Sequence, residues 1–389
     1  MKLKKVLFSL LTCFIFTIFV HTRLVSAEDL VTDGKAAILI EAETGEILYE
    51  KNSHEQLAPA SMTKMMSMYL ILESINNGAL QWDEVIRVSE NAASYGGSQI
   101  YLKPGEKMTV KDLFKSIAIA SANDSVTALA ERVAGSEQAF VELMNNKAKE
   151  LGMNDTVFKN PTGLTAEGHV TSAYDMSIIA KHLLKEYPEI TEFSGLYEDY
   201  IRQDTESPFW LVNTNKLLKS VDGVDGLKTG FTQEAGYCLT AIANRSDMRV
   251  IAVVMGGSKS ETRNQEVARL IEYAYEQYEL VPKLENGLIV SSGYHMLAKN
   301  RSFDIVTGDE VTVLKKKTDV EQESNYSVTL NDAFTLPIQP GDQIGTLTYF
   351  YNGKEYKQVP LTVSEPVEKN SFIGLYTYII SKILFGENA

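Results

Sequence analysis

Ala60-Ser61-Met62-Thr63-Lys64 is the stretch of sequence that decides the fold of this 389-residue chain. The serine and the lysine are three positions apart, so a helix that begins here would place both side chains on one face, one turn apart. A serine hydroxyl becomes a nucleophile when a base takes its proton, and a lysine acts as that base only when it is neutral. For this motif alone, a helix-capping serine followed by a surface lysine is an equally simple interpretation.

A second motif, Ser121-Ala122-Asn123, lies between two segments with helical periodicity. We expect Ser121 to relay a proton to a leaving amine and Asn123 to bind a substrate amide. Serine and asparagine are also common helix caps, so this motif carries little weight by itself.

The third motif is Lys228-Thr229-Gly230, which is predicted to precede a strand. Lys228 and Thr229 offer a charge and a hydroxyl to a terminal carboxylate, and Gly230 lets a substrate approach the backbone closely. Lys228 is also a cation that would lower the pKa of Lys64. The alternative is an edge-strand lysine that protects against aggregation. In this order, the three motifs predict a serine acyl-transfer enzyme whose substrate ends in a carboxylate.

Residues 1–27 have the pattern of a secretory signal peptide, with an uncleaved anchor as the alternative. Three lysines precede an apolar run over residues 6–20, and Val25-Ser26-Ala27 offers a small-residue cleavage site. Removing this segment changes the formal charge from −14 to −18, since it holds four basic residues and no acidic one. A chain this acidic has no electrostatic route to nucleic acid, so we expect no such partner.

Hydrophobic periodicity predicts an α+β catalytic domain over residues 28–280, in which strands from both ends share one sheet. A small β-sandwich domain is expected over 281–366, where short alternating runs surround an Asn352-Gly353 hairpin turn. The predicted catalytic strands are 36–41, 46–49, 236–243 and 249–255, and the predicted helices are 61–75, 110–120, 123–134, 136–151, 174–186 and 261–278.

Residues 370–386 form an apolar segment that we interpret as an amphipathic, membrane-anchoring helix. As a helix its apolar part is about 21 Å long, at 1.5 Å per residue. A bilayer core needs about 30 Å, so the segment is better suited to lying in the membrane surface than to crossing it. A helix docked on its own protein is the alternative.

The chain resembles the low-molecular-weight penicillin-binding proteins, which are serine-type D-alanyl-D-alanine carboxypeptidases. Within that family the similarity is greatest to the bacillus-type enzymes, one of which is linked to sporulation. The fold that this implies is a penicillin-binding/β-lactamase-like catalytic domain, an antiparallel sheet flanked by an α-helical cluster, followed by a small all-β domain and the terminal helix. The resemblance covers almost the whole mature chain and rests on the three motifs together with Gly97-Ser98, Leu102-Lys103-Pro104-Gly105, Asn160-Pro161-Thr162-Gly163-Leu164 and Val224-Asp225-Gly226-Leu227.

The resemblance implies a role for each motif residue. Ser61 would attack the penultimate D-alanine of a peptidoglycan stem pentapeptide, with Lys64 as the base and with Ser121 and Asn123 completing the proton relay. Lys228 and Thr229 would bind the terminal carboxylate beside Gly230, and the N–H groups of Ser61 and Phe231 would form the oxyanion hole. Penicillins would acylate Ser61. No metal or cofactor is needed. The enzyme would be exported to the outer face of the cytoplasmic membrane.

Other functions fit the sequence less well. A class A β-lactamase shares the three motifs but needs a glutamate that activates the deacylating water, and Glu167 has no asparagine four residues on. A Ser-His-Asp hydrolase is disfavoured because no Gly-x-Ser-x-Gly motif occurs, and zinc hydrolysis because no His-Glu-x-x-His motif does. A non-catalytic wall-binding or β-lactam-binding scaffold stays open, although the intact motifs argue against it.

Overall fold

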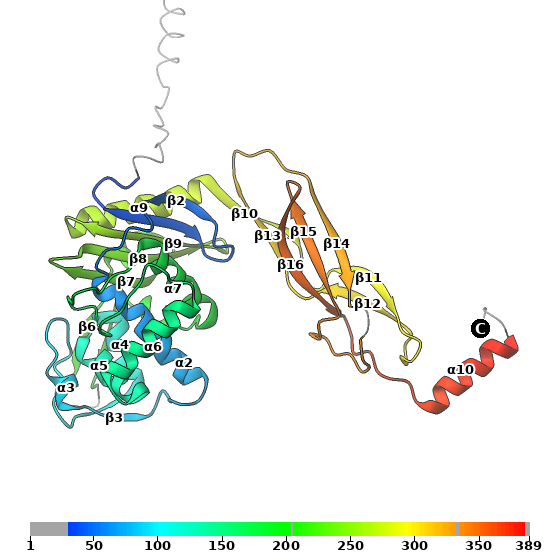
Figure 1. The fold of residues 1–389 in the computed structure, drawn as a ribbon, viewed down its shortest axis with the longest axis horizontal. Coiled ribbons are helices and arrows are strands. Elements are labelled where there is room, and N and C mark those ends of the chain that lie inside the picture. Colours follow the sequence, from blue (N-terminus) through cyan, green and yellow to red (C-terminus); the bar gives the residue numbers. More distant parts are fainter. Residues whose placement is uncertain (1–29, 204, 332–333, 386–389) are drawn as a thin grey trace, which may run out of the picture. The chain divides into compact units, whose positions relative to one another are not determined.

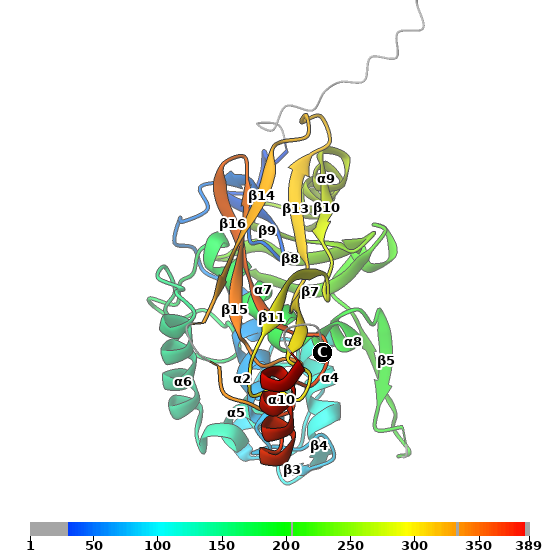
Figure 2. The same cartoon turned by 90° about the vertical axis from the view of Figure 1, so that its right-hand side faces the viewer.

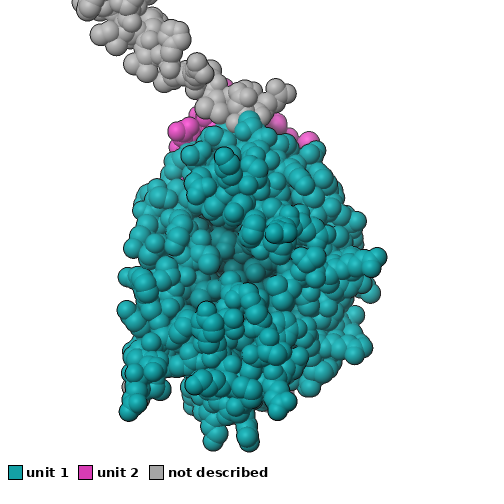
Figure 3. Space-filling view, turned by 90° about the vertical axis from the view of Figure 1, so that its left-hand side faces the viewer, with its two compact units in different colours: residues 1–274 teal, residues 275–389 magenta. Residues whose placement is uncertain are grey.

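The structure is a computed structural model that describes residues 30–203, 205–331 and 334–385 (Figure 1). The chain divides into two compact units, residues 1–274 and 275–389. The expected signal peptide, residues 1–27, lies outside the described residues. One face of unit 1 is hollowed near its centre (Figure 3).

Unit 1 is built on a five-stranded antiparallel sheet in the order β2-β1-β9-β8-β7. The first hairpin of the chain pairs with a strand more than 200 residues later, from Ala36 opposite Met255 to Glu41 opposite Val250. The prediction that strands from both ends share one sheet is therefore confirmed. The strands are β1 (Ala36–Glu41), β2 (Ile47–Lys51), β7 (Val224–Thr232), β8 (Gly236–Arg245) and β9 (Met248–Gly257).

Helices cover both faces of this sheet, and its central strands are therefore buried on both sides. Helix α9 (Ser260–Gln277) lies on one face, and a cluster of helices lies on the other (Figure 1). The cluster contains α2 (Lys64–Asn76), α3 (Glu90–Ala93), α4 (Val110–Ala120), α5 (Asn123–Ala134), α6 (Glu137–Glu150), α7 (Ala173–Glu186) and α8 (Ile190–Ser194).

Helix α2 runs through this cluster, and its first nine residues are all buried. The predicted helix start at Ser61 is wrong. A 3₁₀ turn, η2 (Ala60–Thr63), comes first and α2 begins at Lys64. The physical reason is local: Ala60 takes a positive φ of 48°, and the Met62 N–H bonds the Pro59 carbonyl three residues back.

Among its described residues, unit 1 also contains four short strands that periodicity did not predict. Each has only three or four residues, which is too few to show an alternating pattern. Strand β5 lies at the outer edge of the unit (Figure 2). These elements are β3 (Val85–Arg87), β4 (Lys107–Thr109), β5 (Glu198–Ile201) and β6 (Phe209–Val212), together with the 3₁₀ turn η3 (Lys216–Lys219).

Unit 2 is all-β apart from its terminal helix, in agreement with the sequence. A five-stranded sheet has the order β11-β12-β16-β15-β14, and β10 pairs with β13. The Asn352-Gly353 turn joins β15 to β16 with positive φ at both residues, as a two-residue hairpin requires. The strands are β10 (Tyr278–Leu284), β11 (Ile289–Tyr294), β12 (Ser302–Thr307), β13 (Val311–Lys316), β14 (Ser324–Leu330), β15 (Gly345–Tyr351) and β16 (Lys354–Val363).

Helix α10 (Phe372–Phe385) lies within the segment predicted to be amphipathic. The Arg301 guanidinium stacks 3.2 Å from the centre of the Tyr378 ring. Large apolar side chains on the helix are nevertheless open to solvent, among them Phe372, Ile373, Tyr376, Ile383 and Leu384. Within the described part of the chain, no helix is both long and apolar enough to cross a membrane.

Candidate active site

The first two motifs meet at the side-chain nitrogen of Lys64. Its Nζ donates hydrogen bonds to Ser61 Oγ at 3.1 Å and to Asn123 Oδ1 at 2.7 Å. A third bond, of 2.5 Å, goes to the main-chain carbonyl of Thr162. Ser61 is half-buried, whereas Lys64 and Asn123 are buried. The nucleophile, the base and the amide are thus brought together from η2, α2 and the start of α5.

The environment of Lys64 favours its neutral form. Burial is the largest cause, and the Lys228 ammonium is the second; together they hold the pKa of Lys64 well below its usual value. The Asp124 carboxylate opposes this effect but does not reverse it. A neutral lysine 3.1 Å from a serine hydroxyl can take the hydroxyl proton, which is what nucleophilic attack requires.

Ser121 occupies a sharp turn between α4 and α5. It ends α4 in the left-handed conformation, at φ 62°. Ser121 is therefore a helix C-cap and not a helix N-cap. Its Oγ is buried without a hydrogen-bond partner among the described residues. Asn123 begins α5 and is fixed by bonds from its Nδ2 to the Gly96 carbonyl and from its N–H to the Ser98 carbonyl, both 2.7 Å.

The third motif lies inside β7, the edge strand of the sheet, and the prediction that it precedes a strand is wrong. Residues 224–232 form one strand paired with β8, with a single shift of register between Val224 and Gly226. This was not expected, because Val224-Asp225-Gly226 has the composition of a turn. Lys228 is buried, and burial together with the charge of Arg263 lowers its pKa to about 7. The Thr229 hydroxyl is hydrogen-bonded to the Thr214 hydroxyl at 2.6 Å.

Glycines on two segments pack against the turn that carries Ser61. A Cβ at Gly230 would lie 3.1 Å from the Ser61 nitrogen, so β7 runs directly beside the nucleophile. At Gly163, where φ is +81°, a Cβ would overlap the Ala60 carbonyl. Phe231 is half-exposed and stacks on Tyr237 with ring centres 4.3 Å apart.

Sequence reasoning did not find the roles of several supporting residues. Thr162 lies in one of the stretches that carry the resemblance, but nothing there indicated that its carbonyl would bind Lys64, and Thr214 is far from any motif. His169 belongs to no motif, and its Nε2 lies 3.0 Å from the Thr63 hydroxyl next to the base. Burial lowers the pKa of His169 to about 4, so the ring is neutral at pH 7. Among the described residues no group of three or more histidine, cysteine or acidic side chains is arranged to hold a metal ion.

Comparison with known proteins agrees with this geometry. Residues 23–259 match the D-alanyl-D-alanine carboxypeptidase family, and residues 278–369 match the penicillin-binding protein 5 C-terminal domain. The D-alanyl-D-alanine carboxypeptidase DacF of Bacillus subtilis (strain 168) is 48% identical over 345 residues, which are 89% of this chain and 88% of that protein.

Solved structures show the same relationship. Penicillin-binding protein 5 from Haemophilus influenzae superimposes with a TM-score of 0.70 at 28% identity, over 87% of this chain and 98% of that one. Penicillin-binding protein D2 from Listeria monocytogenes, in its ampicillin-bound form, gives a TM-score of 0.58 at 33% identity, over 64% of this chain and 99% of that one. The chain belongs to the D-alanyl-D-alanine carboxypeptidase family, among the low-molecular-weight penicillin-binding proteins.

Proposed function

We propose that this protein removes the C-terminal D-alanine from peptidoglycan stem pentapeptides through an acyl-enzyme on Ser61. The observation that carries the proposal is the buried Lys64 amino group between Ser61 Oγ and Asn123 Oδ1, with its pKa held low. A stem that has lost its terminal D-alanine can no longer serve as the acyl donor in a cross-linking reaction. The activity would therefore limit cross-linking of the wall.

The proposed acylation uses each side chain once. Lys64 takes the proton of Ser61 as Oγ attacks the carbonyl carbon of the penultimate D-alanine. The N–H groups of Ser61 and Phe231 stabilise the oxyanion that forms. Ser121, whose Oγ has no other partner among the described residues, donates its proton to the departing amine and regains one from Lys64, which returns to its neutral form as the C–N bond breaks. Water then hydrolyses the ester.

Substrate binding is assigned to the edge of β7. The Lys228 ammonium and the Thr229 hydroxyl would hold the terminal carboxylate, since a charge-assisted bond to a carboxylate is stronger than a neutral one. Because Gly230 has no side chain, β7 packs directly against the Ser61 turn, and a substrate bound along this edge would lie next to the nucleophile. A β-lactam also presents a carboxylate next to a reactive carbonyl, and by the same contacts it would acylate Ser61.

Release of D-alanine from diacetyl-L-Lys-D-Ala-D-Ala tests this assignment. We expect release by the wild type, its abolition by prior treatment with penicillin, and loss of both release and penicillin labelling in Ser61→Ala. Unchanged release by Ser61→Ala would contradict the mechanism. Penicillin labelling of a wild type that releases no D-alanine would instead favour the non-catalytic scaffold.

We further propose that the protein is exported, with residues 1–27 as its signal peptide, and that α10 holds it peripherally on the outer face of the cytoplasmic membrane. Support comes from the solvent-exposed apolar side chains of Phe372, Ile373 and Ile383 on a helix about 21 Å long. Truncation after Asn370 should move the protein from the membrane fraction to the medium, and so should the double substitution Ile373→Glu and Ile383→Glu. A truncated protein that still sediments with membranes would contradict the anchor.

A further inference from the structure

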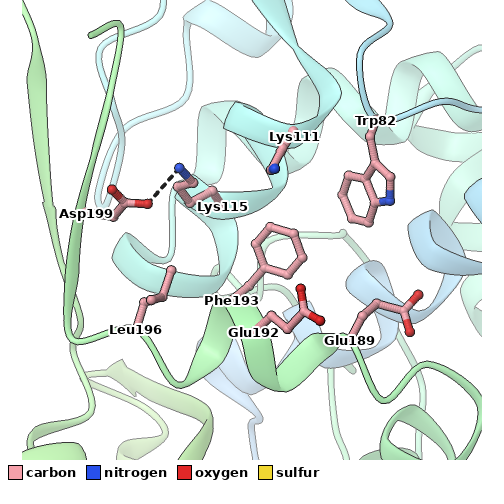
Figure 4. Close-up of a pocket in the computed structure, with 8 residues that line it drawn as sticks. All are labelled: Trp82, Lys111, Lys115, Glu189, Glu192, Phe193, Leu196 and Asp199. Atoms are coloured by element: carbon pink, nitrogen blue, oxygen red, sulfur yellow. Dashed lines mark ion pairs between the residues drawn. The ribbon is translucent and has the colours of Figure 1, made fainter.

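A cavity of about 370 Å³ lies in unit 1 and includes none of the motif residues (Figure 4). It lies between the loop after α2, one face of α4, the short helix α8 and the start of β5. Trp82 and Phe193 supply apolar lining, and Lys111, Lys115, Glu189 and Glu192 supply charge. The function proposed above gives this cavity no role.

The apolar part of the cavity is a fixed aromatic cluster. Trp82 stacks on Phe193 with ring centres 5.2 Å apart, and both rings meet Phe114 edge to face, at 5.3 and 5.0 Å. Phe114 and Phe193 are buried, whereas Trp82 is half-buried. Because the rings hold one another, a ligand would meet a surface that is already formed, which reduces the entropy lost on binding.

The charges around this surface are only partly neutralised within the protein. Lys115 pairs with Asp199 at 2.7 Å. Lys111 on α4 is close enough to Asp199 for its charge to help lower the pKa of that carboxyl, but among the described residues it forms no direct ion pair. Glu189 and Glu192 on the opposite wall form no direct ion pair among these residues either. Figure 4 shows Lys111 on one side of the Phe193 ring and the two glutamates on the other. The cavity thus presents one cation and two anions across an aromatic surface.

We propose that this cavity is a second binding site for a zwitterionic peptide. A ligand carboxylate would face Lys111, a ligand ammonium would face Glu189 and Glu192, and the aliphatic chain between them would lie on the aromatic cluster. If the proposed function holds, the ligand class is the peptidoglycan stem peptide, which carries free carboxylates and the side-chain ammonium of its diamino acid. A neutral glycan would leave all three charges without partners.

A second stem-binding site would raise the local concentration of substrate stems at the active site. Peptidoglycan presents many stems on one polymer, so an enzyme that binds one stem experiences a high effective concentration of its neighbours at the active site. The binding step itself needs no change in the geometry around Ser61.

Intrinsic fluorescence can isolate this site. The chain has two tryptophans, so Trp210→Phe leaves Trp82 as the only one. In this background we would acylate Ser61 with benzylpenicillin, which blocks the active site, and titrate L-Ala-γ-D-Glu-L-Lys. We expect a saturable change in Trp82 emission, together with saturable heat in titration calorimetry on the same sample.

Charge variants then test the assigned contacts. Lys111→Glu and Glu192→Lys should each weaken binding about five-fold, the size expected for solvent-accessible charge pairs. Acetylation of the peptide's ε-amino group should weaken it to a similar degree. The matched control is Lys149→Glu, which reverses an exposed charge on α6 away from the cavity and should leave binding unchanged. Complete penicillin labelling shows that each variant is folded.

Three results would overturn the proposal: no saturable signal by either method, equal affinities in the wild type and both cavity variants, or tighter binding of an N-acetylglucosamine disaccharide than of the peptide. Release of D-alanine from diacetyl-L-Lys-D-Ala-D-Ala, measured on unacylated samples of the same preparations, reports on the proposed activity separately. Failure of the second site would therefore leave release intact, and failure of the activity would be seen as lost release.

Discussion

Replacing Gly163 by alanine should disable Ser61 without touching any catalytic side chain. Gly163 has a φ of +81°, and a Cβ there would overlap the Ala60 carbonyl immediately before the nucleophile. A left-handed conformation costs an L-residue about 1–2 kcal/mol, and overpacking typically adds about 1–3 kcal/mol. The variant should therefore lose roughly 2–5 kcal/mol of folding free energy unless the loop or the Ser61 turn moves apart.

Movement of the loop would be equally damaging, because the neighbouring Thr162 carbonyl accepts a hydrogen bond from Lys64 Nζ. Misplacement of a catalytic group by about 1 Å costs on the order of 100-fold in rate. We therefore expect penicillin to acylate Gly163→Ala about 100-fold more slowly than the wild type, as followed with a fluorescent penicillin at a temperature where circular dichroism shows the variant folded.

Gly152→Ala is the matched control for this experiment. Gly152 has nearly the same backbone conformation, with φ +78°, but a Cβ there would meet nothing within 4 Å. It should lose only about 1 kcal/mol of stability and acylate at the wild-type rate. Wild-type acylation by a folded Gly163→Ala protein, or an equal loss of rate in Gly152→Ala, would refute the argument that close packing against Ala60 positions the nucleophile.

Three further predictions follow from the same site. Lys228→Met removes a cation that lowers the pKa of Lys64, so the acidic limb of the pH–acylation profile should move to higher pH; a shift to lower pH would contradict the assigned coupling. Thr214→Val removes the 2.6 Å hydrogen bond to Thr229 and should raise KM for D-alanine release about five-fold, the value of one hydrogen bond, with little change in kcat; a fall in kcat alone would argue against a role in carboxylate binding. His169 has a pKa of about 4 when folded and about 6.5 when unfolded, so the unfolded chain binds the extra proton between these values and stability falls as the pH drops from 6.5 to 4. Up to about 3 kcal/mol is lost in that window, and thermal melts of His169→Gln should show a weaker dependence on pH there.

The elements that the sequence predicted well are those whose local pattern is strong. Helices 110–120 and 123–134 have the bounds predicted from periodicity, since their apolar faces repeat over at least three turns. The Asn352-Gly353 turn followed from two residues that tolerate positive φ. Elements without such a pattern were missed or misplaced: β3 to β6 are too short, and the 3₁₀ turn at Ser61 depends on how Ala60 packs.

The sequence by itself determined the chemistry and the fold family. Three motifs supply two serines, two lysines, an amide and a threonine hydroxyl in a fixed order, and their side chains are what acyl transfer requires. Apolar periodicity determined most of the longer helices and strands, because burial of one face depends on a spacing that is visible in the chain.

The tertiary structure alone decided how those groups act. The pKa of Lys64 is low because folding buries it and brings Lys228, 164 residues later, near enough to repel its charge. The Thr162 carbonyl binds Lys64 and the Thr214 hydroxyl binds Thr229 only because folding places them there. The sequence does not show which backbone carbonyl or which isolated threonine will make such a contact. The electrostatics of the site come from contacts between distant segments, and only the folded chain brings those segments together.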